Sequence, residues 1–164
     1  MITVGGENLI DYVQTGLDGG LPIFTAVPGG SCYNVAIAIA RQNQPVTYVT
    51  PISKDNLGNI LAERLIADEV SLGTARIDAP TSLAIVTLSD GQPSYQFYRT
   101  ETAERQITAQ LLSEAIHKST TIFHIGSLSL IDGEDANLWE RKFQELDRQG
   151  VITSLDPNAR PIAV

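Results

Sequence analysis

The sequence predicts an α/β fold. Its last third alternates strand, helix and strand, with apolar runs at 121–125 and 151–155 on either side of an amphipathic stretch at 133–149. Two further strand-like segments, 82–88 and 94–99, are separated by the turn signal Ser-Asp-Gly-Gln and predict a hairpin. We therefore expect a mostly parallel sheet with helices, accompanied by a smaller antiparallel element.

Composition limits the possible classes. The chain has 164 residues, 43% of them hydrophobic, which is enough for one domain with a proper core. A net charge of −8 argues against a nucleic-acid partner. No apolar run approaches the ~20 residues that span a bilayer, and the N-terminus does not look like a signal peptide. A single cysteine, Cys32, fits a reducing compartment, so we expect a cytoplasmic protein.

The first third begins with a strand at 2–4 that breaks at two glycines and resumes as an extended segment at 8–13. Residues 14–27 contain three glycines and a proline and predict turns around short strands. Asp11 follows an apolar run, where a buried carboxylate needs a partner. It could bind a ligand hydroxyl or only cap a turn, and the residues alone leave both readings open.

The segment from Pro28 to Arg41 is the most informative one. Gly29 and Gly30 open an apolar helix predicted over about 31–42, and Asn34 lies in its first turn. Glycines allow backbone to approach a ligand closely, a helix start offers unpaired N–H groups, and an amide side chain both donates and accepts. This combination suits a polyhydroxylated small molecule. The alternative is a loop followed by a buried helix, in which Cys32 is a small buried residue.

The middle of the chain continues the alternation. A β-branched strand is expected at 46–52, then a helix capped by Asp55 or Asn56 with leucines at helical spacing, and later a short helix at 109–118. In the second hairpin strand, Tyr95, Phe97 and Arg99 share one face.

The last third has clear helix boundaries. Asp132 is the candidate N-cap of the helix at 133–149, and Gly150 ends it as a C′ residue. The two flanking strands should be parallel, which places the loops 126–129 and 156–160 at neighbouring carboxyl ends, where open α/β sheets bind ligands. In the second loop, Arg160 could pair with Asp156 or point into the site.

Several common motifs are absent. The sequence has no G-x-x-x-x-G-K-[ST] phosphate loop and no G-x-G-x-x-G dinucleotide fingerprint. His117 and His124 have no partner at metal-ligand spacing, and His124 is predicted to be a satisfied core histidine. We therefore expect no metal site in this chain.

Five segments occur in an order and spacing that resemble a known family. They are Gly-Glu-x-Leu-Ile-Asp at 6–11, Pro-Gly-Gly with Asn-Val-Ala at 28–36, Ser-Lys-Asp-x-x-Gly at 53–58, Phe-His-Ile-Gly-Ser-Leu-Ser at 123–129, and Asp-Pro-Asn-Ala-Arg at 156–160. Together they resemble the carbohydrate kinases that include ribokinase, fructokinase and 2-keto-3-deoxygluconate kinase. The sequence departs from the family pattern in two places. Gln42-Asn43 follows Ala-Arg where the family usually has Leu-Gly, and Ser53 stands in place of a glycine.

The resemblance implies a ribokinase-like fold, a three-layer sandwich with a mostly parallel central sheet and a small β-sheet lid. Residues 1–164 would form its N-terminal portion, truncated, with lid segments at about 12–24 and 82–100. The lid often pairs in a homodimer. The uncovered edge of a truncated sheet would also favour self-association.

The resemblance also assigns site residues, all in the acceptor half of the site. Asp11, Gly30 and Asn34 would hold sugar hydroxyls, with Gly29 lending backbone. Phe97 would present a ring to the sugar and Arg99 would reach a ligand carboxylate or hydroxyl. Asn158 and Arg160 would lie near the transferred phosphate.

The implied activity is ATP-dependent phosphorylation of a small sugar or sugar acid, of the fructose or 2-keto-3-deoxygluconate type, at a primary hydroxyl. The family's catalytic base and most residues for ATP and Mg2+ would lie beyond Val164. The chain would then be inactive alone. The alternative is a non-catalytic sugar-binding or scaffold module.

Overall fold

The larger of two sheets contains five parallel strands. A computed structural model describes residues 1–89 and 92–159. In this sheet the order is β5-β4-β1-β8-β9, and each neighbouring pair is parallel. The strands are β5 (Ser71–Leu72), β4 (Val46–Tyr48), β1 (Ile2–Val4), β8 (Ile122–Gly126) and β9 (Ile152–Asp156). The expected parallel pairing across the last third of the chain is confirmed by the β8–β9 register.

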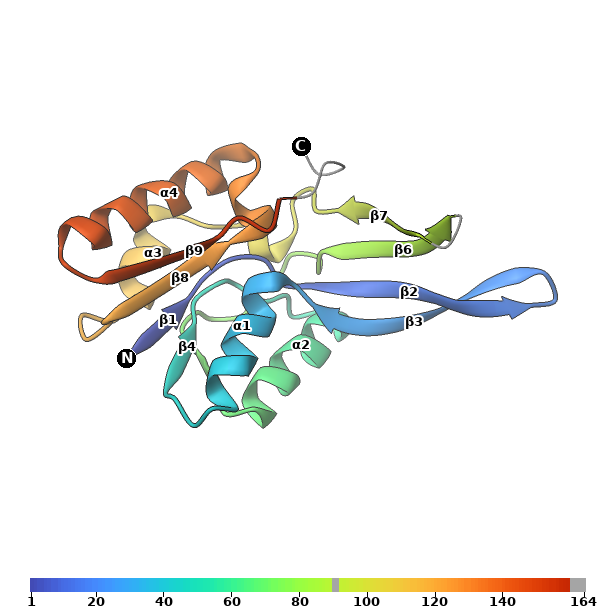
Figure 1. Ribbon diagram of the computed structural model, residues 1–164, viewed down its shortest axis with the longest axis horizontal. Coiled ribbons are helices and arrows are strands. Elements are labelled where there is room, and N and C mark those ends of the chain that lie inside the picture. The colour runs from blue at the N-terminus through green and yellow to red at the C-terminus, as the bar shows by residue number, and fades with distance from the viewer. Residues whose placement is uncertain (90–91, 160–164) are drawn as a thin grey trace.

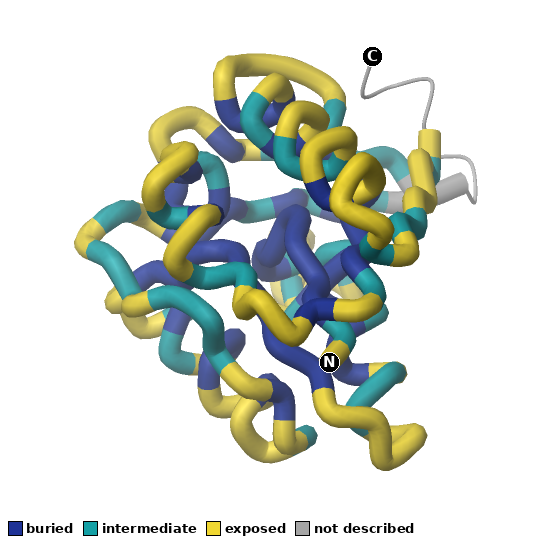
Figure 2. The backbone as a smooth tube through the Cα atoms, turned by 90° about the vertical axis from the view of Figure 1, so that its left-hand side faces the viewer, coloured by how far each residue is buried: buried dark blue, intermediate teal, exposed yellow. Residues whose placement is uncertain are grey.

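Helices cover both faces of this sheet, giving three layers (Figure 1). On one face lie α1 (Ser31–Ala40) and α2 (Asn56–Ala67), and on the other α3 (Ala109–Ala115) and α4 (Gly133–Arg148). Each face has its own core: Tyr33, Tyr48 and Leu61 lie in the first, Phe123 and Trp139 in the second. The buried backbone runs through the centre of Figure 2, with the exposed helix surfaces outside it.

The smaller sheet has the order β3-β2-β6-β7 and projects away from the three layers (Figure 1). Its strands are β2 (Leu9–Asp18), β3 (Leu21–Gly29), β6 (Leu83–Ser89) and β7 (Gln92–Tyr98). β6 and β7 form the predicted antiparallel hairpin, and β2 pairs with β6 in parallel. Two short 3-10 helices, η1 (Ala103–Arg105) and η2 (Ser127–Leu130), lie in the segments that follow β7 and β8.

The prediction of turns around short strands at 14–27 was wrong. This region is one long hairpin, whose tight turn is made by Gly19 and Gly20, both with positive φ. Gly16 coincides with a register shift in the ladder, as expected of a β-bulge. Pro22 is tolerated because β3 is an edge strand, where one side of the backbone needs no ladder partner.

Three element boundaries also differ from expectation. The strand expected over 46–52 ends at Tyr48, because Pro51 has no N–H and β1 has already ended at Val4. The helix expected to reach residue 42 ends at Ala40 in a turn in which Asn43 has positive φ. The helix expected over 109–118 ends at Ala115.

The predicted caps are mostly confirmed. The Asp55 carboxylate accepts a hydrogen bond from the Gly58 N–H at 2.7 Å at the start of α2, and a Cβ at Gly58 would collide with Ser53. Gly150 follows α4 with φ of 83°. Asp132 occupies the N-cap position of α4, but its side chain makes no capping bond and instead lies 3.2 Å from Arg105.

None of the helices in the described part of the chain combines the length and apolar character that a bilayer crossing needs.

Candidate functional site

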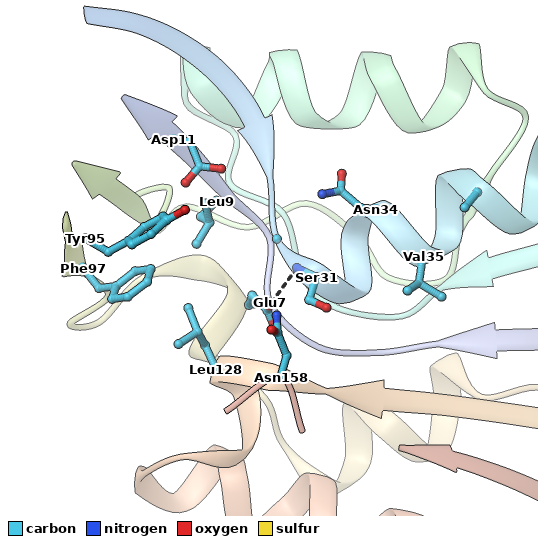
Figure 3. Close-up of a pocket in the computed structure, with 12 residues that line it drawn as sticks. Glu7, Leu9, Asp11, Ser31, Asn34, Val35, Tyr95, Phe97, Leu128 and Asn158 are labelled. Carbon is cyan, nitrogen blue, oxygen red and sulfur yellow. Dashed lines mark hydrogen bonds between the residues drawn. The ribbon is translucent and has the colours of Figure 1, made fainter. Parts of the chain in front are cut away.

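A cavity of about 470 Å³ lies where the two sheets meet the start of α1 (Figure 3). It brings together residues from the β1–β2 junction, β2, α1, β7, η2 and the segment after β9. Its lining consists of Glu7, Leu9, Asp11, Gly30, Ser31, Asn34, Val35, Ala38, Tyr95, Phe97, Leu128 and Asn158. Five of the residues singled out from the sequence are therefore neighbours: Asp11, Gly30, Asn34, Phe97 and Asn158.

The two glycines permit a close crossing of chain segments. Gly30 has φ of 114°, and a Cβ there would lie 2.5 Å from the Glu7 carbonyl oxygen. A Cβ at Gly29 would collide with the Asp11 carboxylate. The turn from β3 into α1 therefore packs against the β1–β2 junction only because both positions lack side chains.

The helix α1 is less buried than its apolar sequence predicts. Cys32, Tyr33 and Ala36 are buried against the sheet, but Asn34 and Ala38 are exposed on the cavity side. The Asn34 amide and the Asp11 carboxylate lie on opposite sides of the cavity in Figure 3. The cavity thus has a hydrogen-bonding group on each side.

Aromatic rings form one wall. Tyr95 and Phe97 stack with their ring centroids 6.0 Å apart and their planes 10° apart. Strand alternation places both on the same face of β7. The sequence reasoning named only Phe97 as a site residue, although the same alternation was sufficient to include Tyr95.

Glu7 is a site residue that the sequence reasoning missed. Its side chain is 1% exposed and lines the cavity. Its Oε1 accepts a hydrogen bond of 2.6 Å from the Ser31 N–H at the start of α1 (Figure 3). Burial raises the pKa of Glu7 to about 7, against the lowering effect of the hydrogen bond from Ser31.

Arg99 does not line the cavity, contrary to the expectation that it would reach a ligand. β7 ends at Tyr98, and the Arg99 side chain is buried at the base of the small sheet. Its Nε lies 2.7 Å from Glu104 Oε1, and its Nη1 donates to the Leu128 carbonyl at 3.0 Å. The Arg99 guanidinium is thus paired within the protein, as a buried charge requires.

The loop after β9 contributes Asn158, which has φ of 39°. Its N–H donates to Asp156 Oδ1 at 3.0 Å, and its amide lies 3.5 Å from Ser127 Oγ. Arg160 lies outside the described residues. Its pairing with Asp156 and its contact with a phosphate therefore stay predictions.

Cys32 is buried as predicted, and burial raises the pKa of its thiol. His124 is buried within β8 and its Nδ1 contacts Ser154 Oγ at 3.0 Å, but its Nε2 has no partner among the described residues, so the histidine is only half satisfied. No group of three or more His, Cys, Asp or Glu side chains in the described ranges could hold a metal ion. The carboxylates of the cavity therefore do not fit a metal centre by themselves.

Comparison with known proteins agrees with this architecture. Residues 9–163 match the model of the pfkB family carbohydrate kinases. The chain is 37% identical to fructokinase-1 of Zea mays over 161 residues, covering 94% of this chain and 50% of that protein. It is 36% identical to the fructokinase of Rhizobium leguminosarum bv. trifolii, covering 98% and 49% respectively.

Solved structures give the same result. The fructokinase of Xylella fastidiosa superposes with a TM-score of 0.90 at 31% identity, over 99% of this chain and 53% of that one. A putative ribokinase II from E. coli superposes with a TM-score of 0.84 at 26% identity, over 97% and 53%. The expected ribokinase-like fold is confirmed, and the chain spans about half the length of the relatives it matches. By its matched residues and its fold, the chain belongs to the pfkB family of carbohydrate kinases.

Proposed function

We propose that this chain binds the acceptor sugar of an ATP-dependent kinase and that the acceptor is a neutral ketose of the fructose type, phosphorylated at a primary hydroxyl. One observation carries the proposal: the cavity combines Asp11, Asn34 and a glycine turn with a stacked aromatic wall. A carboxylate and an amide suit hydroxyl groups, and aromatic faces pack against the C–H groups of a sugar ring.

The charge of the cavity favours fructose over a sugar acid. Its described lining contains two acidic side chains, Glu7 and Asp11, and no Lys or Arg. Arg99, which could have paired with a ligand carboxylate, is paired with Glu104. Among the described lining residues a carboxylate ligand would meet like charge and no cationic partner, which disfavours its binding. The fructokinases among the similar proteins agree with this choice.

In the proposed mechanism the described residues bind and orient the acceptor. Asp11 accepts hydrogen bonds from sugar hydroxyls, Asn34 donates and accepts, and the Gly29-Gly30 turn brings backbone close to the ring. The small sheet acts as a lid that excludes water, so that phosphate passes to the sugar. ATP would supply the phosphoryl group; the Xylella fastidiosa fructokinase has been solved with ATP bound. No cluster of the described residues fits Mg2+.

The exposed face of the lid fits a homodimer. Leu21, Ile23 and Val27 alternate along β3 and are exposed on one face of it, and Leu17 is exposed on β2 beside the same hairpin turn. Pairing of two lids would remove this surface from water. We therefore include a dimer through the lid in the proposal, with the mass in solution by light scattering as its test.

The acceptor proposal is tested by thermal stability with fructose, 2-keto-3-deoxygluconate, ribose and ATP-Mg added separately, because a ligand that binds the folded state raises stability. We expect fructose to stabilise the chain and 2-keto-3-deoxygluconate to have no comparable effect. The variant Asp11→Asn should weaken fructose binding by about 10- to 100-fold, since it removes a charge-assisted hydrogen bond.

Asp18→Asn is the matched control, because Asp18 lies at the far end of the same strand and is exposed. It should bind fructose like the unmodified chain. Equal stabilisation by the sugar acid, or unchanged fructose binding by Asp11→Asn, would contradict the proposal. Stabilisation by ATP-Mg in the absence of sugar would show that this chain itself binds nucleotide, which the proposal does not assign to it.

A further inference from the structure

Only one of the two carboxyl oxygens of Glu7 has a structural role. The N-cap residue of α1 is Gly30, which has no side chain to cap the helix. Glu7 Oε1 substitutes for the missing cap by accepting the Ser31 N–H at 2.6 Å. A carboxylate at this place is also favoured by the positive end of the helix dipole. One carboxyl oxygen is thus fully explained by the fold.

The second oxygen has no such explanation. Glu7 Oε2 is buried and has no hydrogen-bond partner among the described residues. A buried polar atom without a partner is costly, so each case calls for a reason. The residue lines the same cavity as Asp11 and Asn34, and Figure 3 shows its carboxyl group at the floor of that cavity beside Ser31.

We propose that Glu7 Oε2 binds a hydroxyl of the acceptor sugar, so that the acceptor is held between two carboxylates, Glu7 and Asp11. The assignment rests on the proposed function, because the hydroxyl belongs to the sugar proposed for this cavity. The sugar hydroxyl donates to Oε2 while Oε1 keeps its bond to Ser31. The protein therefore couples the position of the sugar to the first turn of α1, which also carries Asn34.

The surroundings of Glu7 keep its charge sensitive to pH near neutrality. Burial, the largest cause, raises the pKa of Glu7 to about 7, while the hydrogen bond from Ser31 lowers it and the charges of Glu104 and Arg99 have smaller raising and lowering effects. Across the cavity stands Asp11. The two other neighbouring groups, Cys32 and Tyr48, have pKa values raised by burial, away from neutrality. Burial therefore brings the charge change of Glu7 itself close to pH 7.

The decisive variant is Glu7→Gln, measured by titration calorimetry with fructose. The glutamine carbonyl can still accept the Ser31 N–H, so the cap is preserved while Oε2 becomes an amide donor. We expect fructose to bind about 10- to 100-fold more weakly. Glu63→Gln is the matched control, because Glu63 is exposed in the middle of α2 and should leave binding unchanged.

Two readouts separate ligand binding from a purely structural role. Affinity of the unmodified chain should fall as the pH is lowered through about 7, because a protonated Oε2 loses the charge-assisted bond, whereas Glu7→Gln should show no such step. In a series of monodeoxy fructoses, one analogue should bind the unmodified chain and Glu7→Gln equally, since it lacks the hydroxyl that Glu7 contacts.

The outcomes distinguish the two proposals. If the unmodified chain binds fructose and Asp11→Asn does not, but Glu7→Gln binds like the unmodified chain at every pH, the role of Glu7 is overturned and the proposed function stands. An equal loss with every deoxy analogue would reduce Glu7 to a cap of α1 and overturn the assignment too. Absence of fructose binding by the unmodified chain would overturn both proposals.

Discussion

The large and small sheets are stabilised in different ways. The large sheet is covered by helices on both faces, and each face has a cluster of buried apolar side chains. The small sheet contributes Ile10 to the first of these clusters, with Tyr12 and Leu83 packed against it, and otherwise contributes to one minor cluster of Leu9, Ala84 and Leu128 with Phe97 packed against it. Its far end carries exposed leucines, with Leu17 66% and Leu21 72% exposed. The difference indicates that the large sheet supplies stability and the small sheet supplies a surface over the cavity.

A buried polar network joins the small sheet to the rest. The Ser82 hydroxyl donates to Glu104 at 2.9 Å at the start of β6, and Arg99 pairs with Glu104 just after β7. Arg99 also donates to the Leu128 carbonyl in η2. The base of the small sheet is thus fixed by hydrogen bonds and one ion pair, together with the apolar packing of Ile10 and Leu83 against the first core.

The largest predicted effect lies in the large sheet. Trp139 is fully buried, packs against Phe123 with ring centroids 6.4 Å apart, and lies directly over Gly5. We expect Trp139→Ala to lower the free energy of unfolding by about 3–5 kcal/mol, measured by urea denaturation, because it leaves a large cavity. Trp139→Phe should lose less, since the indole Nε1 has no hydrogen-bond partner among the described residues to forfeit. A loss below about 1 kcal/mol for the alanine variant would contradict this account of the core.

The second prediction concerns the junction. Arg99→Met leaves the Glu104 carboxylate, 1% exposed, without its cation, and should cost about 3 kcal/mol in the same measurement. The double variant Arg99→Met with Glu104→Leu should recover part of this loss, because no charge is then left buried. Lys54→Met is the control: it breaks an exposed pair with Asp78 and should cost under about 1 kcal/mol. Equal losses for Arg99→Met and Lys54→Met would show that the junction does not depend on its ion pair.

The sequence was most predictive where periodicity and capping act locally. The amphipathic helix at 133–149, the cap at Asp55 and the parallel β8–β9 pair were all predicted, because each follows from the pattern within one helix or one strand–helix–strand unit. The cavity was predictable in part, since Asp11, Gly30, Asn34, Phe97 and Asn158 were expected together from the family resemblance.

What the sequence did not reveal depends on contacts between distant segments. The long β2–β3 hairpin contains glycines and prolines that signal turns, yet an edge position and a bulge accommodate them. The pairing of Arg99 with Glu104 depends on where β7 ends, which alternation does not fix. Glu7 was not singled out as a site residue by the sequence, and it is buried where α1 begins at Ser31.

The smallest predicted effect lies at the far end of the small sheet. Leu17 is 66% exposed on β2, near the hairpin turn, so truncation removes little buried area. We expect Leu17→Ala to change the free energy of unfolding by less than about 0.5 kcal/mol, in contrast to Trp139→Ala. The measurement should be made at several protein concentrations, because the proposed dimer would bury Leu17 and make its loss concentration-dependent. A large loss that is independent of concentration would show that this end of the sheet contributes to stability within one chain, and would remove the contrast between the two sheets.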